Sequence, residues 1–364
     1  MDERADVVVI GGGVVGLSVA RSLALKQVGS VLLLERGQLG REASFAAAGM
    51  LAPQAEANTD DAFFQLACRS RDLYQAFAAQ LLEETGIDVE LDRTGTLYCA
   101  FTEHDCTEIA ARFAWQRSRG LPVEQLTAGE ARELEPNLAP NLLRALKFPL
   151  DTQVENRRLL SALIAANEKL GVKSRVNTTV ESLRIERGQV AGVITSQGFL
   201  NTRNVVIASG AWTSFIRIES AAPRIRIEPV RGQMLCFDAK PALARHVIYS
   251  PRGYLVPRRD GRLLAGSTTE KAGFAKEVTA KGLESIRTRA LEIVPGVAGL
   301  TLVDSWAGLR PRAPDDLPVL GKSNETDGLF FATGHYRNGI LLAPLTGELI
   351  AALIADNVVA EELH

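Results

Sequence analysis

The chain has 364 residues, of which 46% are hydrophobic and 23% are charged, and its formal net charge is −2. This length exceeds what a single hydrophobic core commonly supports, so we expect two closely joined domains. The near-neutral charge and the absence of long charged runs argue against a nucleic acid or an anionic membrane as partner. The sequence also shows neither a signal-peptide pattern nor an apolar run of about 18 residues, so we expect a cytoplasmic protein.

The first 35 residues predict a nucleotide-binding βαβ unit. The apolar run Val7–Ile10 predicts a strand, and a helical segment then leads to a second strand at Val31–Leu34. Between them stand three glycines with the spacing G-x-G-x-x-G: Gly11, Gly13 and Gly16. The first permits a tight turn, the second lets a pyrophosphate approach the main chain, and the third lets the helix pack on the strand. Glu35 follows the second strand, where a carboxylate accepts hydrogen bonds from ribose hydroxyls, which favours FAD or NAD over NADP.

The remaining elements follow from hydrophobic periodicity. Helical spacing predicts helices at Asp61–Thr85, Arg157–Leu170 and Thr279–Ile293. Alternation predicts a strand within 93–101, several short strands between 171 and 208, and an antiparallel sheet between 229 and 266. The last segment, 328–356, predicts a strand, a glycine-rich turn and a closing helix. Since one βαβ unit cannot complete a parallel sheet, we expect the strands near Ala208 and Ala332 to join it.

No side-chain pattern predicts a metal site or a catalytic group acting by itself. The four cysteines lack C-x-x-C spacing, and the four histidines are scattered, so we expect free thiols and no metal. Neither a Ser-His-Asp order nor a paired-acid signature is present. We therefore assign no catalytic side chain and expect a cofactor to carry out the chemistry.

Four segments resemble the D-amino-acid oxidase family of flavoproteins, and within it most of all the glycine oxidases of thiazole biosynthesis. They are SFAAAGMLAPQAE (Ser44–Glu56), YLVPRRDGRLLAGSTTE (Tyr254–Glu270), WAGLRPRAPDDLPVLG (Trp306–Gly321) and GHYRNGILLAP (Gly334–Pro344). The resemblance implies an α/β plus α+β fold, with a Rossmann-like FAD-binding domain of the glutathione-reductase type and an antiparallel-sheet substrate domain. The implied FAD-binding domain comprises residues 1–90, 150–225 and 305–364, and the substrate-binding domain comprises 91–149 and 226–304.

The resemblance also implies noncovalent FAD, because WAGLRPRAPDD lacks the cysteine through which related amine oxidases often attach flavin. Small side chains between Ser44 and Met50 suit close contact with a pyrophosphate and a flat isoalloxazine ring. A helix beginning near Gly339 would stabilise negative charge on the reduced ring. The implied FAD contacts are Gly11, Gly13, Val14, Val15, Gly16, Glu35, Arg36, Ala43, Ser44, Ala48, Gly49, Met50, Val180, His335, Tyr336, Arg337, Asn338, Gly339, Ile340 and Leu341.

Three residues are candidates for binding the substrate. Arg310 lies in an apolar run where a guanidinium needs a partner, and a carboxylate can accept two parallel hydrogen bonds from it. The alternative is a structural ion pair with an acid nearby in the sequence: Asp304, Asp315 or Asp316. Tyr254 resembles the tyrosine that helps to hold the same carboxylate, although it could instead be a core aromatic. Arg337 resembles an arginine near the pocket, although it could instead be a solvated loop residue.

The implied reaction is oxidation of glycine or another small amino acid. Hydride transfer from the substrate to flavin N5 gives an imine, which hydrolyses to a 2-oxo acid and ammonia, and oxygen reoxidises the flavin to give H2O2. The resemblance also suggests a role in thiamin thiazole synthesis and a homotetramer. Thr269 stands where glycine oxidases tend to carry methionine, so sarcosine, small D-amino acids and bulkier N-substituted glycines remain open as substrates. The competing hypotheses are an amino-acid dehydrogenase with a non-oxygen acceptor, a flavin-binding subunit without turnover and, more distantly, an NAD dehydrogenase.

Overall fold

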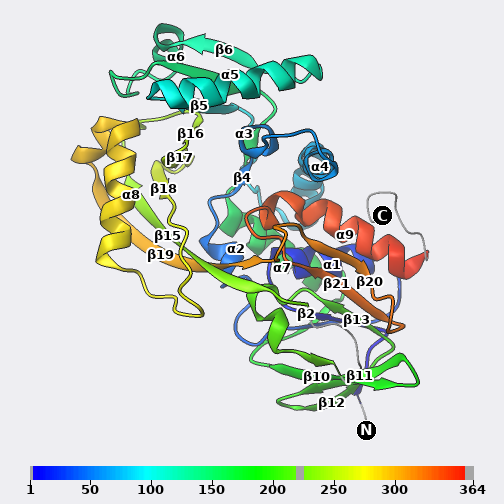
Figure 1. Ribbon diagram of the computed structural model, residues 1–364. Coiled ribbons are helices and arrows are strands. Elements are labelled where there is room, and N and C mark those ends of the chain that lie inside the picture. The colour runs from blue at the N-terminus through cyan, green and yellow to red at the C-terminus, as the bar shows by residue number, and fades with distance from the viewer. Residues whose placement is uncertain (1–2, 219–224, 357–364) are drawn as a thin grey trace.

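The computed structural model describes residues 3–218 and 225–356, which form two parts that meet along a central segment (Figure 1). One part is built on a six-stranded sheet and the other on an eight-stranded sheet. Three short segments of the predicted FAD-binding domain lie outside the described residues: 1–2, 219–224 and 357–364. The expected α/β plus α+β fold, with a Rossmann-like part and a largely antiparallel part, is confirmed.

The six-stranded sheet forms around the predicted nucleotide-binding unit. Its strand order is β20 (Val319–Lys322), β21 (Leu329–Thr333), β13 (Asn204–Ile207), β2 (Val7–Ile10), β3 (Val31–Leu34) and β9 (Lys173–Arg175). Neighbouring strands pair in parallel, except that β20 and β21 are antiparallel. Strands β13 and β21 come from distant parts of the chain and complete the sheet, as predicted for the segments near Ala208 and Ala332.

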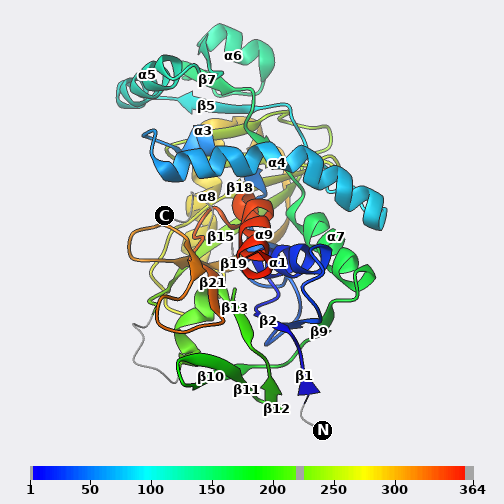
Figure 2. The ribbon, with the colours of Figure 1, turned by 90° about the vertical axis from the view of Figure 1, so that its right-hand side faces the viewer.

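Alternate residues of β2 face two different cores. Val7 and Val9 pack against a helical layer, whereas Val8 and Ile10 pack against a second sheet. The helical layer consists of α1 (Val14–Leu25), α4 (Ala62–Thr85), α7 (Asn156–Lys169) and α9 (Gly339–Ala355). The second sheet has the order β1 (Glu3–Arg4), β12 (Gly198–Asn201), β11 (Gln189–Thr195), β10 (Val180–Glu186) and β14 (Arg217–Ile218). Figure 2 shows these helices above the central strands and β10–β12 below them. Burial on both faces explains the uninterrupted apolar sequences of β2 and β3.

The eight-stranded sheet carries the other part of the molecule. Its order is β19 (Thr301–Arg312), β15 (Glu228–Asp238), β18 (Arg262–Gly266), β17 (Gly253–Pro257), β16 (Val247–Ser250), β5 (Thr96–Ala100), β7 (Arg144–Phe148) and β6 (Glu124–Thr127). Only β16 and β5, among these pairs of described strands, are parallel. Helices α6 (Ala128–Leu134) and α8 (Ala280–Ile293) cover one face. Helix α5 (Glu103–Ser118) packs on the opposite face of β5.

Short elements join the two parts. They are α2 (Ala43–Ala46), β4 (Met50–Leu51), α3 (Pro53–Glu56), β8 (Thr152–Gln153) and η1 (Gly210–Phe215), whereas η2 (Pro295–Gly299) packs on α8 within the eight-stranded part. Strands β4 and β8 form a two-residue antiparallel pair. Helix α2 lies against β19 so closely that a Cβ added at Gly308 would be 2.5 Å from the Ala46 Cβ. The segment predicted to contact flavin is therefore packed directly on the strand that carries Arg310.

The long predicted helices are confirmed, and capping side chains explain where two of them begin. The Asp61 carboxylate accepts from the amide of Phe64 before α4, and the Thr279 hydroxyl accepts from the amide of Gly282 before α8. Hydrophobic periodicity does not predict α5 and α6. Each nevertheless begins with a capping box, T-x-x-D at Thr102 and T-x-x-E at Thr127, which is a local signal for a helix start.

One predicted domain boundary is wrong. The boundary at residue 305 falls inside β19, which pairs with β15 from Thr301 to Arg312. Residues 305–312 therefore belong to the eight-stranded sheet. The turn residues Pro295, Gly296 and Gly299 precede the strand in the sequence, but only the long-range pairing with β15 shows to which sheet the strand belongs.

The described residues hold no structural feature for metal binding or for crossing a membrane. Within 3–218 and 225–356, none of the helices combines the length and the apolar character of a bilayer span. No group of three or more His, Cys, Asp or Glu side chains in these ranges could hold a metal ion.

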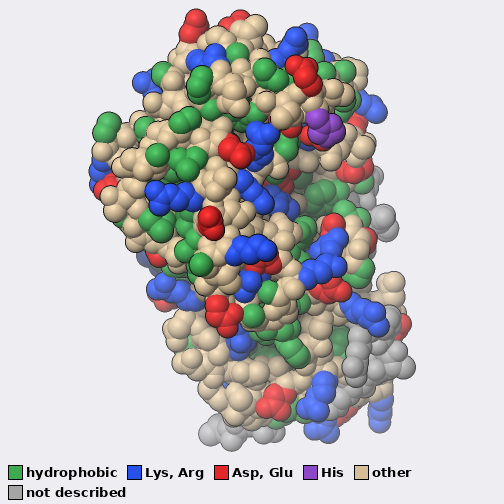
Figure 3. Space-filling view, turned by 60° about the vertical axis from the view of Figure 1, so that its left-hand side comes forward, with side chains coloured by type: hydrophobic (Ala, Val, Ile, Leu, Met, Phe, Trp, Pro, Cys, Tyr) green, Lys and Arg blue, Asp and Glu red, His purple; other side chains and the backbone are tan. Residues whose placement is uncertain are grey.

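All four cysteines are free, and burial raises the pKa of the Cys99 thiol to about 12. Positive and negative side chains are interspersed on the face shown in Figure 3.

Candidate functional site

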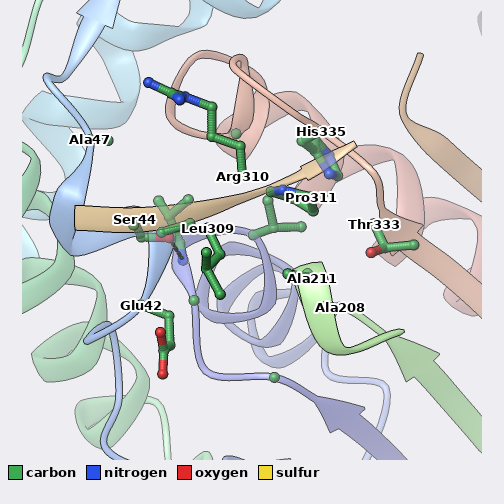
Figure 4. A pocket seen from close by; sticks show the side chains of 18 of the residues that line it. Glu42, Ser44, Ala47, Ala208, Ala211, Leu309, Arg310, Pro311, Thr333 and His335 are labelled. Carbon is green, nitrogen blue, oxygen red and sulfur yellow. Dashed lines mark hydrogen bonds between the residues drawn. The ribbon is translucent and has the colours of Figure 1, made fainter. Parts of the chain in front are cut away.

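A cavity of about 380 Å³ lies between the two large sheets. Its walls come from the glycine turn after β2, the segment from α2 to α3, the loop after β13, strands β15, β17 and β19, and the start of α9. Every residue predicted to bind FAD or substrate lines it, except Gly16 and Leu341. Figure 4 shows one wall, where Leu309 of β19 lies on the side of Ser44 and the loop with Ala208 and Ala211, whereas the Arg310 side chain extends from the opposite face of the strand.

The two exceptions support the site from behind. A Cβ added at Gly16 would lie 1.8 Å from the carbonyl oxygen of Gly11, so this glycine lets α1 pack against the turn, as predicted for the third glycine. Leu341 is buried, and its carbonyl oxygen accepts a hydrogen bond from the Ser70 hydroxyl at 2.7 Å. This bond ties the first turn of α9 to α4.

The glycine turn leaves the N-terminus of α1 open to the cavity. Gly11 has φ 111°, and a Cβ there would clash with the carbonyl oxygen of Ala208 at 2.4 Å. A Cβ at Gly13 would meet only the Ser44 Oγ, at 3.3 Å, and would therefore project into the cavity. The amide of Val14 donates to the Ser44 Oγ at 3.0 Å. The dipole of α1, whose N-terminus lines the cavity, favours binding of an anion such as a phosphate.

Glu35 is held rigidly at the end of β3. Its side chain is buried, and its two carboxylate oxygens accept from the amides of Gly12 and Gly37, each at 2.8 Å. The next residue, Arg36, stacks on the Trp212 ring at 3.7 Å. Arg36 also pairs with Glu42 at 2.7 Å. The carboxylate of Glu35 is thus presented at one end of the cavity beside an aromatic and charged rim.

A buried arginine from the other part of the molecule holds the segment 48–50 in place. Arg258 Nη2 donates to the carbonyl oxygen of Ala48 at 2.7 Å, and Nη1 donates to the carbonyl oxygen of Val154 at 3.0 Å. The side-chain oxygens of Gln153 and Asn156 accept at 2.8 and 3.2 Å. No ion pair of Arg258 with a described acid is present, and burial lowers its pKa to about 10. Four uncharged oxygens therefore hold this guanidinium.

Arg310 lies in the cavity without a carboxylate partner among the described residues. Its Nη1 donates to the carbonyl oxygen of Thr268 at 3.1 Å, and its Nη2 donates to the Ser267 Oγ at 2.7 Å. The alternative of a structural ion pair is not seen, because Asp316 pairs with Arg312 instead. A Cβ at Gly232 on β15 would lie 2.1 Å from the Arg310 Nη1, so only glycine leaves room for the guanidinium.

Tyr254 and Arg337 line the same cavity. Tyr254 is buried, stacks against Tyr249 with ring centroids 6.1 Å apart, and points its hydroxyl at the sulfur of Met234 at 3.3 Å. Arg337 Nη2 donates to the Tyr249 hydroxyl at 3.4 Å and lies 3.5 Å from a carboxylate oxygen of Glu56. The negative charge of Glu56 raises the pKa of Arg337. Arg337 is therefore a paired residue of the cavity wall.

His335 belongs to the turn before α9 and is buried. Its Nε2 lies 3.0 Å from the Thr346 hydroxyl, and desolvation lowers its pKa to about 4. The imidazole is therefore neutral at physiological pH and contributes shape and a hydrogen bond, without a positive charge.

Comparison with known proteins identifies the family. A family model described as FAD dependent oxidoreductase matches residues 6–353. A glycine oxidase from Geobacillus kaustophilus is 38% identical over 366 residues, which cover 100% of this chain and 96% of that relative. The chain belongs to the family of FAD-dependent oxidoreductases. A bifunctional protein ThiO/ThiG from Synechocystis sp. is 35% identical over 369 residues, which cover 100% of this chain and 54% of that protein. The crystal structure of glycine oxidase from Geobacillus kaustophilus matches with a TM-score of 0.92 and 37% identity, over 99% of this chain and 96% of that chain.

The cavity of this FAD-dependent oxidoreductase fits its cofactor. A dinucleotide needs a crowded glycine turn, an open helix N-terminus and an acid at the end of the next strand, and all three lie along one cavity. The wall between Ala43 and Gly49 consists mostly of small residues, which permits close approach of a flat ring. No cysteine is among the described residues that line the cavity.

Several lining residues were not predicted from the sequence. Gly232 and Met234 come from β15, Trp212 and Phe215 come from η1, and Glu56 comes from α3. Glu56 lies inside the first of the four resembling segments, so its position was a signal that sequence reasoning did not use. The others are brought to the cavity only by strand pairing and domain packing. Thr269, at the position where glycine oxidases tend to carry methionine, does not line the cavity, and neither do Arg252 and Gly253.

We expect Arg258→Met to destabilise the fold and to reduce FAD content. The substitution leaves four buried oxygens without their charged donor, which should lower the free energy of unfolding by about 3 kcal/mol. Denaturant unfolding and the flavin absorbance released by acid precipitation would measure the two effects. Arg259→Met is the matched control, because Arg259 is an exposed arginine paired with Asp88, and it should cost less than about 1 kcal/mol. Equal effects of the two substitutions would contradict the assigned role.

We expect His335 to make stability depend on pH between about 6.5 and 4. Above pH 6.5 the imidazole is neutral in both the folded and unfolded states. Below that pH the unfolded chain takes up a proton that the folded chain excludes, so the free energy of unfolding falls, by up to about 3 kcal/mol near pH 4. Denaturant unfolding at saturating FAD should therefore show the stability difference between wild type and His335→Gln shrinking as the pH falls. A difference that stays constant with pH would rule out this titration.

Proposed function

We propose that this FAD-dependent oxidoreductase oxidises glycine or another small amino acid and releases H2O2. The observation that carries the proposal is Arg310, a cavity guanidinium held by two uncharged oxygens and free of any described carboxylate. A guanidinium has five N–H donors in a fork that matches a carboxylate, and only two of those of Arg310 have partners among the described residues. The relatives named glycine oxidase support an amino acid as the source of this carboxylate.

Arg310 and Tyr254 would orient the substrate. The guanidinium would bind the carboxylate with two parallel hydrogen bonds, and the Tyr254 hydroxyl, whose present partner is a weakly accepting sulfur, would donate to the same group. This anchoring would fix the substrate Cα–H toward the segment between Ala48 and Met50. Restricting the substrate in this way accounts for a large part of the rate without a catalytic side chain.

FAD, when bound, would accept the hydride and pass the electrons to oxygen. The residues of the chain would hold it: Glu35 at the ribose, the amides of the glycine turn and of α1 at the pyrophosphate, and the 335–340 turn beside the flavin ring. The N-terminus of α9, which begins at Gly339, would stabilise negative charge there. The cysteine-free lining supports noncovalent attachment.

We also propose a pathway, a cellular location and an oligomeric state for the protein. The bifunctional ThiO/ThiG relative supports a role in thiamin thiazole synthesis, where the imine of glycine would be consumed. A cytoplasmic location and a homotetramer complete the proposal. The location rests on the charge and hydropathy of the sequence, and the homotetramer rests on the resemblance to glycine oxidases.

A substrate screen would test the proposed function directly. The purified yellow protein should consume oxygen and release H2O2 with glycine and, to differing extents, with sarcosine, D-alanine, D-proline and N-alkyl glycines. Flavin that is bleached anaerobically by glycine but is not reoxidised by oxygen would indicate a dehydrogenase. Flavin that no amino acid bleaches would indicate a binding subunit without turnover.

We expect Arg310→Ala to raise the KM for glycine by about 100-fold while the bound flavin spectrum changes little. Loss of a desolvated charge-assisted pair costs about 2–5 kcal/mol, which corresponds to a factor between about 30 and several thousand. Steady-state oxygen consumption would measure it. Arg252→Ala is the control, because Arg252 pairs with Glu292 outside the cavity lining and should leave KM near its wild-type value. An unchanged KM in Arg310→Ala would remove Arg310 from the substrate site.

A further inference from the structure

The cavity contains two guanidinium groups that differ in their partners. Arg310 has uncharged hydrogen-bond acceptors only, among the described residues, whereas Arg337 faces the carboxylate of Glu56 at 3.5 Å. The side chains of Arg337 and Glu56 are 28% and 24% exposed, so both are partly shielded from solvent. Both also line the cavity. One arginine is therefore available to an anion, and the other is already neutralised.

Glu56 is not a mobile surface acid. It ends the short helix α3, whose main chain is held by a buried polar network. The Asp151 carboxylate accepts from the amide of Ala55 at 2.8 Å, and Arg112 donates to the carbonyl oxygen of Ala55 at 2.7 Å. Gln54 and Asp151 are fully buried. This network fixes the position from which the Glu56 carboxylate reaches Arg337.

A row of contacts connects Arg337 with the region of Arg310. Arg337 donates to the Tyr249 hydroxyl, and Tyr249 stacks on Tyr254. Tyr254 pairs across the sheet with Gly266, the residue before Ser267, which accepts from Arg310. The paired arginine and the unpaired arginine thus lie along one wall. A substrate held at Arg310 and extended by a second anionic group toward the tyrosines would reach the Arg337–Glu56 pair.

We propose that Glu56 is a specificity-determining residue: by neutralising Arg337 it makes the cavity select amino acids with a single carboxylate and disfavour N-substituted glycines with a second one. This inference rests on the proposed function. A second carboxylate of the substrate would have to displace the Glu56 carboxylate from Arg337. Glu56 competes strongly because it belongs to the same chain and lies beside Arg337, and its negative charge would also repel the second carboxylate. Removal of the Glu56 charge would turn Arg337 into a second anion site.

The decisive variant is Glu56→Gln, tested as the FAD-loaded protein. The kcat/KM ratio for iminodiacetate over glycine should rise by about tenfold or more relative to wild type, a factor that corresponds to about 1.4 kcal/mol. Glu56→Asp keeps the charge and should stay closer to wild type. Glu292→Gln removes the acid of another arginine pair, outside the cavity lining, and should leave the ratio unchanged. An unchanged ratio in Glu56→Gln would overturn the inference.

A binding measurement separates this inference from the proposed function. Titration of the oxidised flavoprotein with malonate and with acetate, followed by the flavin absorption spectrum, needs no turnover. Glu56→Gln should tighten malonate by about tenfold more than acetate. Should glycine not be oxidised at all, the proposed function fails, and this titration still decides whether Glu56 excludes a second carboxylate.

Arg337→Gln supplies the test if Glu56→Gln does not fold or retain FAD. With its cation removed, the Glu56 carboxylate is left unneutralised in the cavity and should repel dianions more strongly. Malonate should then bind more weakly, relative to acetate, than it does to wild type. Equal or tighter relative binding of malonate in Arg337→Gln would overturn the inference.

Discussion

The cavity is organised around the Arg310 guanidinium, which has no carboxylate partner among residues 3–218 and 225–356. Burying part of a charge without an opposite charge is costly, so the fold holds Arg310 with neutral oxygens and provides space for it at Gly232. Such an arrangement leaves both the positive charge and most of the N–H donors available to a ligand. An anionic ligand would therefore find a strong hydrogen-bonding partner in Arg310, whose positive charge contributes little to the stability of the protein itself.

The two parts of the molecule meet where backbones come unusually close. Helix α2 touches β19 at Gly308, and the turn at Gly49 lies against the carbonyl oxygen of Val154, where a Cβ would be only 2.0 Å away. Arg258 then ties this turn to the eight-stranded sheet. These contacts place the segment that follows the nucleotide-binding unit directly beside the strand that carries Arg310. The cavity walls that come from the two parts of the molecule are therefore packed directly against each other.

The charges along the cavity are arranged in separate groups. Glu35 lies on backbone amides, Arg36 pairs with Glu42, and Arg337 pairs with Glu56. Arg36 and Arg337 are neutralised by carboxylates, whereas Arg310 has only uncharged hydrogen-bond partners among the described residues. Among the described residues that line the cavity, Arg310 would therefore be the strongest partner for a small carboxylate. Selectivity then follows from which charges are already satisfied as well as from the size of the pocket.

The sequence by itself determined the nucleotide-binding unit, the long helices and the residue types of the site. Those signals are local: the glycine spacing, an acid after a strand, capping residues such as Asp61, and apolar runs of the right period. Only the tertiary structure decided that β19 belongs to the eight-stranded sheet, that Gly232 makes room for Arg310, and that Glu56 neutralises Arg337. These facts depend on pairings between residues from about 60 to 280 positions apart in the chain, and no local pattern encodes which distant partner a strand or a charge will meet.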